Sequence, residues 1–528
     1  MLTAGCWALA AALLACHHAS PIVDPIGPGE IAQPVPPAPS VSPGFSAPSA
    51  SSADPASPAR PAPASLVALQ HDLDAILTAP ELARGYWGVL VKSLDTDDTL
   101  YAMNARKLMM PASAMKIVTL AAAASRLGWD YQFGTRVIAG GPIAAGSLGG
   151  DLIIVGSGDP SLTDATAPAV FASWADTLKQ QGIARIAGRI IGDDRAFGGE
   201  ALGMGWSWDD LPDGYAAGVG ALQFDENMAR VTIAPGAAVG APAIVTIAPD
   251  TAGLVVRNHL TTGAAGSAES VETHRQPGSV VIELRGSVPL SSAAGVRTVS
   301  VDNPTAFFVA ALKSALVAAG IDVRGAAVDI DDIADPPALD GMRTLVDYRS
   351  PPLSMLAVRM MKESQNQYAE TLLRTLGASA GAPTAENGAA VATLIVREWG
   401  VPEGGLILRD GSGLSRYDYI SPESLVAILE HVDADPALQT PFEAALPLAG
   451  RDGTLANRMK GTAADGNARA KTGSMSNVRA LCGYVTAADG ERLVFSILAN
   501  NFEIASNVVN RAADAIVVRL AKYVGAER

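Results

Sequence analysis

Cysteine, histidine and basic residues are scarce in this chain of 528 residues. Of its 3 cysteines, Cys6 and Cys16 lie in an apolar N-terminal segment, so no disulfide framework can hold the body of the chain together. The 6 histidines show no ligand spacing, which argues against a metal site. The formal charge of −15 argues against nucleic acid, because phosphate binding needs a basic surface, and an anionic bilayer would also repel the chain. What is present is the composition of a globular protein, with 49% hydrophobic and 17% charged residues.

The N-terminus has the pattern of a targeting segment. Its apolar run is too short to span a bilayer, and LLAC at residues 13–16 looks like a bacterial lipobox. We therefore expect residues 1–16 to be a lipoprotein signal peptide, Cys16 to be lipidated, and the protein to lie on the periplasmic side of a bacterial cell envelope. An ordinary cleaved signal peptide is the alternative, because MLTAG lacks the expected positive charges. Residues 17–64 are rich in Pro, Ala and Ser, which predicts a disordered tether.

The body of the chain, from about Ser65, has an α+β pattern. Strand-like runs lie near both of its ends, YWGVLVKSLD and DTLYAMNA early and VRALCGYVTA and RLVFSILANN late, next to helical patterns. Between them, short β-like runs broken by Gly and Pro surround one clear helical pattern, TAFFVAALKSALVAAG. We predict an antiparallel sheet flanked by helices, built from residues 65–135 and 345–528 and interrupted by a β-rich insertion over 136–344.

One short stretch of the body carries a candidate nucleophile and its base. PASAMKIVTL, residues 111–120, places Ser113 three residues before Lys116 at the start of a predicted helix. That spacing puts both side chains on one face, so Lys116 can reach the Ser113 hydroxyl. Serine is a poor nucleophile until a base takes its proton, and a desolvated lysine with a lowered pKa can be that base. A helix cap followed by a snorkelling lysine is the alternative for this motif alone.

Two further motifs each occur once: SQN at residues 364–366 and KTG at residues 471–473. Either could hold capping or surface residues, but S-x-x-K, S-x-N and K-T-G in this order are the motif set of penicillin-binding proteins and serine β-lactamases. By contrast, DGSGLS fails as a nucleophile elbow, because Asp410 stands where the first glycine of G-x-S-x-G belongs. Without suitably placed histidines, a Ser-His-Asp hydrolase has little support.

From about Ser65 to Arg528 the chain resembles the D-alanyl-D-alanine carboxypeptidase/endopeptidase family of low-molecular-mass class C penicillin-binding proteins, peptidase family S13. Beside the three motifs, the resemblance rests on GSGDPSLT (156–163), GWSWDDL (205–211), ALQFDEN (221–227), DGSGLSR (410–416) and AKTGSMSNVRALCGYV (470–485). The departure is Gln365, where the family usually has Asp. The resemblance implies a penicillin-binding transpeptidase domain split by an insertion of two small, mainly β domains.

The resemblance assigns catalytic roles that fit the chemistry of each residue. Ser113 would attack the carbonyl of a D-Ala-D-X bond with Lys116 as base, and the N–H groups of Ser113 and Ser474 would form the oxyanion hole. Ser364 would pass a proton between Lys116 and the leaving amine. Asn366 would hold Lys116 and the substrate amide. Water would then hydrolyse the acyl-serine, and no cofactor is implied.

Other residues would bind the substrate. Lys471 and Thr472 would bind the terminal carboxylate, and Gly473 would let the substrate backbone approach the strand edge. The resemblance also implies a pocket for the side chain of the diamino acid that precedes D-alanine, and it would be lined by Asp210, Arg416 and Met475. Asp210 and Arg416 could equally be solvated surface charges, and Met475 could fill a gap in the core.

The expected substrates are peptidoglycan stem peptides, and β-lactams should acylate the same serine. Two alternatives stay open. A serine β-lactamase shares the machinery but should turn over penicillin quickly, which a chromogenic cephalosporin would reveal. A non-catalytic envelope lipoprotein that only binds peptidoglycan is the other alternative, and the intact set of three motifs argues against it.

Overall fold

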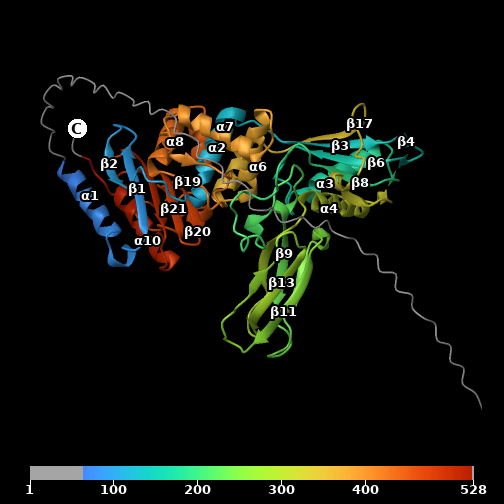
Figure 1. Ribbon diagram of the computed structural model, residues 1–528, viewed down its shortest axis with the longest axis horizontal. Helices are drawn as coiled ribbons and strands as arrows, with labels where there is room; N and C mark the ends of the chain where they lie inside the picture. Colours follow the sequence, from blue (N-terminus) through green and yellow to red (C-terminus); the bar gives the residue numbers. More distant parts are fainter. Residues whose placement is uncertain (1–62, 526–528) are drawn as a thin grey trace, which may run out of the picture. The chain divides into compact units, whose positions relative to one another are not determined.

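Strands from both ends of the chain form one five-stranded antiparallel sheet, in the order β2-β1-β22-β21-β20. The computed structural model describes residues 63–525. Figure 1 shows the early strands in blue beside the late strands in red. The strands are β1 (Tyr86–Ser93), β2 (Thr99–Met103), β20 (Arg469–Met475), β21 (Val478–Thr486) and β22 (Arg492–Asn500). The antiparallel sheet expected from the two ends of the body is confirmed, and β20, which contains KTG, is an edge strand.

Helices cover both faces of this sheet, which explains why β21 and β22 are buried along almost their whole length. On one face, α1 (Ala64–Leu77) and α10 (Ser506–Ala521) contact each other and share a core with the sheet. On the other face, α8 (Pro422–Ala434) contacts β1 and β22. Behind α8 lie α2 (Lys116–Leu127), α5 (Leu353–Lys362), α6 (Asn366–Ser379), α7 (Ala385–Glu398) and α9 (Gln439–Ala445). Within residues 63–525, no helix combines the length and apolar character needed to cross a membrane.

The helix α2 lies at the centre of this helical group. Every residue from Lys116 to Ala124 is buried, and the run of four alanines lets α6, α7 and α8 approach closely. A helix that is apolar on all sides belongs in a core. The one charged side chain in the buried part of α2, Lys116, is therefore held among packed helices.

The run from Pro351 to Gly377 has helical periodicity throughout, but in the structure it forms two helices. The α5 helix ends at Lys362 and α6 begins at Asn366. Between them, Ser364 has a φ of 64°, in the left-handed region that a residue with a side chain rarely adopts. This break leaves Ser364 and Gln365 outside both helices and makes Asn366 the first residue of α6. The side chains of Ser364 and Asn366 then reach Lys471 and Lys116, respectively.

The insertion has two cores. Its first part is a mixed sheet in the order β16-β8-β6-β3-β17, with two helices packed on it. These elements are β3 (Gly134–Gly140), β6 (Asp151–Gly156), β8 (Ile190–Asp193), β16 (Ala327–Asp329), β17 (Arg343–Arg349), α3 (Ala167–Gln180) and α4 (Pro304–Ala318). A small sheet at its side contains β4 (Ile143–Ala144), β5 (Ser147–Leu148), β7 (Arg185–Ile186) and β15 (Asp322–Val323).

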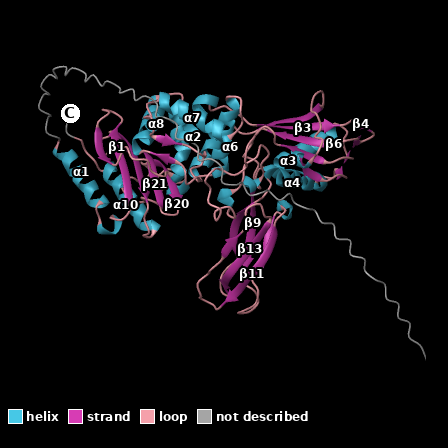
Figure 2. Cartoon of the chain, viewed as in Figure 1, coloured by secondary structure: helices cyan, strands magenta, loops and turns pink. Residues whose placement is uncertain are grey.

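The second part of the insertion is built from two three-stranded sheets around a separate core. Figure 2 shows its longer strands, β9, β11 and β13, as one group. The strands are β9 (Met228–Ala234), β10 (Ile244–Ala248), β11 (Val255–Gly263), β12 (Glu272–His274), β13 (Val281–Pro289) and β14 (Gly295–Ser300). The helix α4 joins the two cores, because Phe307 packs in the second and Phe308 in the first. A two-part insertion between the two halves of the domain that holds the five-stranded sheet is thus present.

The insertion differs from the sequence prediction in one helix and in its limits. The helix α3 was not predicted, although Phe171, Trp174 and Leu178 form its buried stripe at helical spacing. The predicted limits, 136 and 344, fall inside β3 and β17, which pair with each other along their whole length. The strand pairing therefore places the junctions near residues 134 and 349. The predicted signal peptide, the lipidated Cys16 and nearly all of the tether lie outside the described residues.

Candidate active site

Ser113 lies on a tight turn just before α2. The sequence predicts a helix opened by Ser113, whereas in the structure Ser113 lies in a 3-10 turn, η2 (Ala112–Met115), and α2 begins at Lys116. Ala112 has a φ of 46°, a left-handed conformation that costs a residue with a Cβ on the order of 1–3 kcal/mol. The turn still brings the two side chains together, because Lys116 Nζ lies 2.9 Å from Ser113 Oγ. The contact predicted from the spacing of three is present.

Lys116 has two further partners, and both are carbonyl oxygens. Its Nζ donates to Asn366 Oδ1 at 2.6 Å and to the Ser412 carbonyl at 2.9 Å. These oxygens can only accept, whereas the Ser113 hydroxyl can also donate. A neutral amine has two N–H bonds and one lone pair. When both N–H groups of the neutral amine donate to the two carbonyl oxygens, its lone pair points at the Ser113 hydroxyl, which is the geometry of a base.

The surroundings of Lys116 favour the neutral amine. Burial lowers the pKa of Lys116 from 10.5 to about 7, although the carboxylates of Asp410 and Glu370 raise it. Burial also lowers the pKa of Lys471 well below its ordinary value, and the nearby charge of Lys116 lowers it further. Two ammonium groups in one buried site repel each other, so this pair of lysines resists carrying two positive charges at once.

The DGSGLSR loop places the carbonyl of Ser412 against Lys116. Asp410 is fully buried and accepts hydrogen bonds from the N–H of Gly413 and of Ser415, both at 2.6 Å. Glu370 of α6 accepts from the N–H of Gly411 at 3.0 Å and of Ser412 at 2.8 Å. With its N–H groups bound on the carboxylate side, the loop turns the Ser412 carbonyl toward Lys116. Ser412 itself is fully buried, which agrees with the rejection of DGSGLS as a nucleophile elbow.

The SQN loop is held from several sides. Ser364 Oγ accepts a hydrogen bond from Lys471 Nζ at 2.8 Å, and Lys471 Nζ also donates to the carbonyl of Thr472 at 2.8 Å. Asn366 uses both ends of its amide: Oδ1 accepts from Lys116, and Nδ2 donates to the Tyr215 carbonyl at 2.8 Å. The break between α5 and α6 thus connects both lysines of the site to the insertion.

Gly473 faces the nucleophile turn. A Cβ at this position would lie 2.4 Å from the Pro111 carbonyl oxygen and 3.2 Å from Ala112 Cβ. The sequence analysis expected this glycine to make room for the substrate backbone. The structure shows that it lets β20 approach η2, which brings the Ser474 end of the strand close to Ser113, and its role toward the substrate stays a prediction.

A cavity of about 490 Å³ collects seven of the predicted residues. They are Ser113, Ser364, Asn366, Ser474, Asp210, Arg416 and Met475. The other four, Lys116, Lys471, Thr472 and Gly473, lie behind its wall, with both lysines fully buried. Lys471 is linked to the cavity by its hydrogen bond to Ser364 Oγ, and its expected role at the terminal carboxylate of a substrate stays a prediction. Thr472 Oγ1 donates to Thr454 Oγ1 at 2.8 Å.

The segment that contains Asp210 comes from the insertion and packs on the DGSGLSR loop. The Trp206 indole N–H donates to Asp410 at 2.7 Å, Ser415 Oγ donates to the Met204 carbonyl at 2.6 Å, and the Arg416 N–H donates to the Gly205 carbonyl at 3.1 Å. These bonds explain how two segments about 200 residues apart in the chain line one cavity.

Several residues of the site were not predicted from the sequence. Tyr215 lines the cavity, and its hydroxyl donates to Asp210 Oδ1 at 2.7 Å. Arg479 also lines the cavity, with its guanidinium donating to the Met475 and Val478 carbonyls. Glu370 was missed as well. No short motif surrounds Tyr215 or Glu370, and their roles depend on contacts between distant segments.

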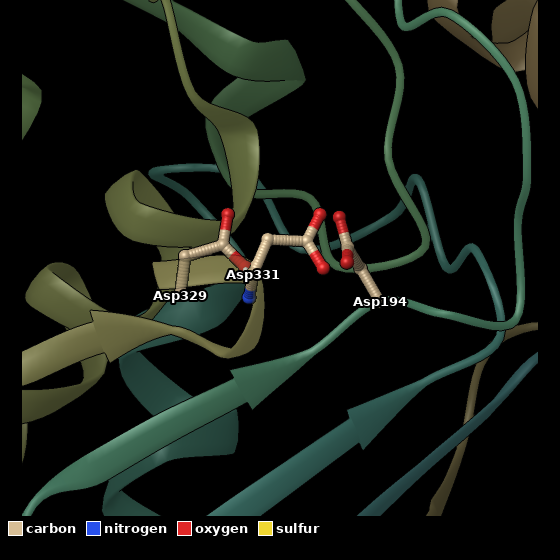
Figure 3. A group of neighbouring side chains, drawn as sticks. All are labelled: Asp194, Asp329 and Asp331. Carbon is tan, nitrogen blue, oxygen red and sulfur yellow. Dashed lines mark hydrogen bonds between the residues drawn. The ribbon is translucent and has the colours of Figure 1, made fainter. Parts of the chain in front are cut away.

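One group of carboxylates lies apart from this cavity, within the first part of the insertion (Figure 3). Asp194, Asp329 and Asp331 have oxygen atoms within 4.8 Å of one another, the one such group among residues 63–525. Thr305 donates to Asp194 at 2.6 Å and Asn303 donates to Asp329 at 2.8 Å. Neighbouring hydroxyl and amide donors thus stabilise two of the three carboxylates, and none of these groups contacts the candidate active site.

The chain is similar to known proteins over most of its length. The model of the D-Ala-D-Ala carboxypeptidase 3 (S13) family matches residues 69–523. The D-alanyl-D-alanine carboxypeptidase of Actinomadura sp. (strain R39) is 37% identical over 475 residues, covering 88% of this chain and 86% of that protein. Penicillin binding protein 4 (dacB) from Haemophilus influenzae has a TM-score of 0.75 at 26% identity, covering 86% of this chain and 99% of that chain. The same protein complexed with a novel β-lactam has a TM-score of 0.69 at 25% identity, with the same coverage.

Proposed function

Because the chain belongs to the D-Ala-D-Ala carboxypeptidase 3 (S13) family, we propose that Ser113 is the nucleophile of a D-Ala-D-Ala carboxypeptidase acting on peptidoglycan stem peptides. Lys116 is the base. The observation that carries this assignment is the lysine whose two carbonyl partners direct its lone pair at the Ser113 hydroxyl. The chemistry follows from that arrangement.

In the acylation step, Lys116 takes the proton from Ser113 as the oxygen attacks the carbonyl of the D-Ala-D-Ala bond. The negative charge of the tetrahedral intermediate is stabilised by the N–H groups of Ser113 and Ser474, which line the same cavity. Ser364 then passes the proton from Lys116 to the leaving amine, with Lys471 donating to its hydroxyl. The C–N bond breaks, D-alanine leaves, and water hydrolyses the acyl-serine.

The remaining predicted residues, in the cavity and just behind its wall, bind the stem peptide. Thr472 and Thr454 form a hydroxyl pair that can reverse its direction, so that Thr472 donates to the terminal carboxylate of the substrate. A bound carboxylate raises the lowered pKa of the buried Lys471, and the protonated side chain then stabilises that carboxylate without contacting it. Asp210 pairs with the amine of the diamino acid, Arg416 with its carboxylate when it has one, and Met475 packs on the methylenes.

Purified peptidoglycan digested with the protein tests this function. The released muropeptides are identified by mass spectrometry, with Ser113→Ala as the matched inactive control. Free D-alanine that the wild type releases and Ser113→Ala does not release indicates a carboxypeptidase. Monomers formed from cross-linked dimers indicate an endopeptidase as well. Rapid turnover of a chromogenic cephalosporin without D-alanine release would favour a β-lactamase. Binding to peptidoglycan without either product would leave only the non-catalytic alternative.

We also propose that the protein is anchored by a lipid on Cys16 in a bacterial cell envelope. The support is in the sequence: LLAC has a small residue, Ala15, directly before the cysteine that would be lipidated, and the Pro-, Ala- and Ser-rich segment that follows can act as an extended tether. Such a tether lets a catalytic domain reach peptidoglycan at some distance from the membrane surface.

A further inference from the structure

A turn of the insertion contacts the SQN loop directly. It is the ALQFDEN segment, whose 3-10 turn η4 (Asp225–Asn227) precedes β9. Glu226 Oε1 accepts a hydrogen bond from Arg359 Nε at 2.7 Å, and Glu226 Oε2 accepts one from Gln365 Nε2 at 2.6 Å. Only 4% of the Glu226 surface is exposed. Both carboxylate oxygens are thus used, one on the last turns of α5 and one on the middle residue of the SQN motif.

The turn is strained and braced, which suits a positioning element. Asp225, Glu226 and Asn227 have φ values of 47°, 56° and 55°, three consecutive left-handed residues that carry side chains. Asn227 Nδ2 donates to the Gly218 carbonyl at 2.8 Å, and Asp225 accepts from Arg230 at 3.0 Å. These contacts hold the turn in a conformation that it would not adopt alone.

A second contact fixes the same turn to the helix that follows the SQN loop. Gln223 Nε2 donates to Thr371 Oγ1 of α6 at 2.9 Å and to the Gly158 carbonyl at 3.2 Å. The segment 223–226 therefore holds α5 through Arg359, the break through Gln365 and α6 through Thr371. Ser364, in its left-handed conformation, lies between these three points.

We propose that Glu226 is a positioning residue of the insertion, which holds Ser364 and Asn366 in their reactive geometry through Gln365 and Arg359. The proposal rests on the function assigned to Ser364 and Asn366 above. It also accounts for the amide at position 365. An acidic residue there would put a second carboxylate against Glu226, and the two could pair only by sharing a proton. Gln365 donates to Glu226 without a proton being taken up, so the contact is kept when Glu226 is ionised.

A reciprocal exchange tests the contact. Gln365→Glu sets two carboxylates opposite each other, so its rate of acylation by labelled penicillin, relative to the wild type at the same pH, should fall by roughly 10- to 100-fold as the pH rises from about 5 to about 8. Glu226→Gln/Gln365→Glu restores one amide and one carboxylate and should recover most of that loss. Glu226→Gln alone should lose only a few fold, because the Gln365 amide can turn to accept.

Other charged groups lie near Glu226, and one of them provides the control variant. Arg359 faces it from α5, Glu363 from the residue directly after α5, Tyr368 from α6, and Asp225 from its own turn. Glu363 is also within 3.5 Å of Arg359, but its side chain is 54% exposed and it makes no contact with Gln365. Glu363→Gln is therefore the matched control, and we expect it to stay within about twofold of the wild type at every pH.

Rates are normalised to the penicillin-titratable fraction, so a loss of folded protein does not count as a loss of activity. In parallel, hydrogen exchange of the amides around residues 363–366 is measured for the wild type, Glu226→Ala and Glu363→Gln. We expect Glu226→Ala to increase that exchange by roughly tenfold or more and Glu363→Gln to leave it unchanged. This measurement reads the loop without using catalysis.

The outcomes separate the two proposals. If the wild type is inert toward stem peptides but hydrogen exchange around residues 363–366 increases in Glu226→Ala, the proposed function is wrong and the positioning role of Glu226 is supported. If the wild type is active but the rate of Gln365→Glu relative to the wild type does not change with pH, or if the double variant fails to recover, Glu226 does not position the loop. If Glu226→Ala does not fold, the acylation rates of Gln365→Glu, of the double variant and of Glu363→Gln decide whether Glu226 positions the loop.

Discussion

The rate of acylation of Ser113 should rise with pH through the range in which Lys116 loses its proton. Burial lowers the pKa of Lys116 from 10.5 to about 7. The neutral amine is the reactive form, and it exists above the pKa, so the rate increases as the pH rises. With a pKa of about 7, the neutral fraction is about one in eleven near pH 6 and about ten in eleven near pH 8. We therefore expect a roughly tenfold increase between these two pH values, followed by a plateau.

The assay is the second-order rate constant for acylation by a fluorescent penicillin, measured from about pH 5.5 to pH 9. Lys116→Arg keeps a positive charge but cannot act as a base. Its acylation rate constant should therefore not increase with pH and should be lower than that of the wild type by a factor of at least about 10³. Glu370→Gln removes a buried carboxylate that raises the pKa of Lys116, so the midpoint should move to lower pH. Burial raises the pKa of Glu370 to about 7 as well, so this variant identifies the titrating group. A flat profile in the wild type, or a rise that vanishes in Glu370→Gln, would refute the assignment of Lys116 as base.

Three further predictions concern other parts of the molecule. Gly473→Ala would place a Cβ 2.4 Å from the Pro111 carbonyl oxygen and push β20 from Ser113, so penicillin acylation should fall by on the order of 10- to 100-fold with little change in Tm. Asp210→Ala should lower kcat/KM for stem peptides with a free diamino-acid amine by on the order of 10- to 100-fold, and much more than it slows acylation by penicillin, which lacks that amine; equal losses would point to damage at Ser113. Cys16→Ser should release an active protein from the membrane fraction, and unchanged partitioning into detergent would end the lipoprotein proposal.

The central pair of the site could be predicted because it depends on local geometry. A spacing of three residues brings Lys116 to Ser113 whether the turn is a 3-10 or an α-helix. The order of the three motifs pointed to the chemistry, and the strand patterns at the two ends of the body were strong enough to predict one sheet. These features lie in contiguous stretches of the sequence, where periodicity and turn residues can be read directly.

The features that could not be predicted depend on contacts between distant segments. The break at Ser364 lies inside an unbroken helical pattern, because tertiary contacts from Lys471 and Glu226 outweigh local propensity there. The Ser412 carbonyl became a partner of Lys116 only through the carboxylates that fold its loop. The helix α3 differs from these cases, because its apolar residues have helical spacing in the sequence, but β-like runs surround it and obscure that spacing.

The central claim is that Ser113 is the acylated nucleophile. The most direct test is to incubate the protein with labelled penicillin, digest it, and locate the adduct by mass spectrometry, with Ser113→Ala treated in parallel. The account predicts one adduct on the peptide that contains Ser113, at a stoichiometry near one, and no adduct on the variant. An adduct on Ser364 or Ser412, or full labelling of Ser113→Ala, would contradict it.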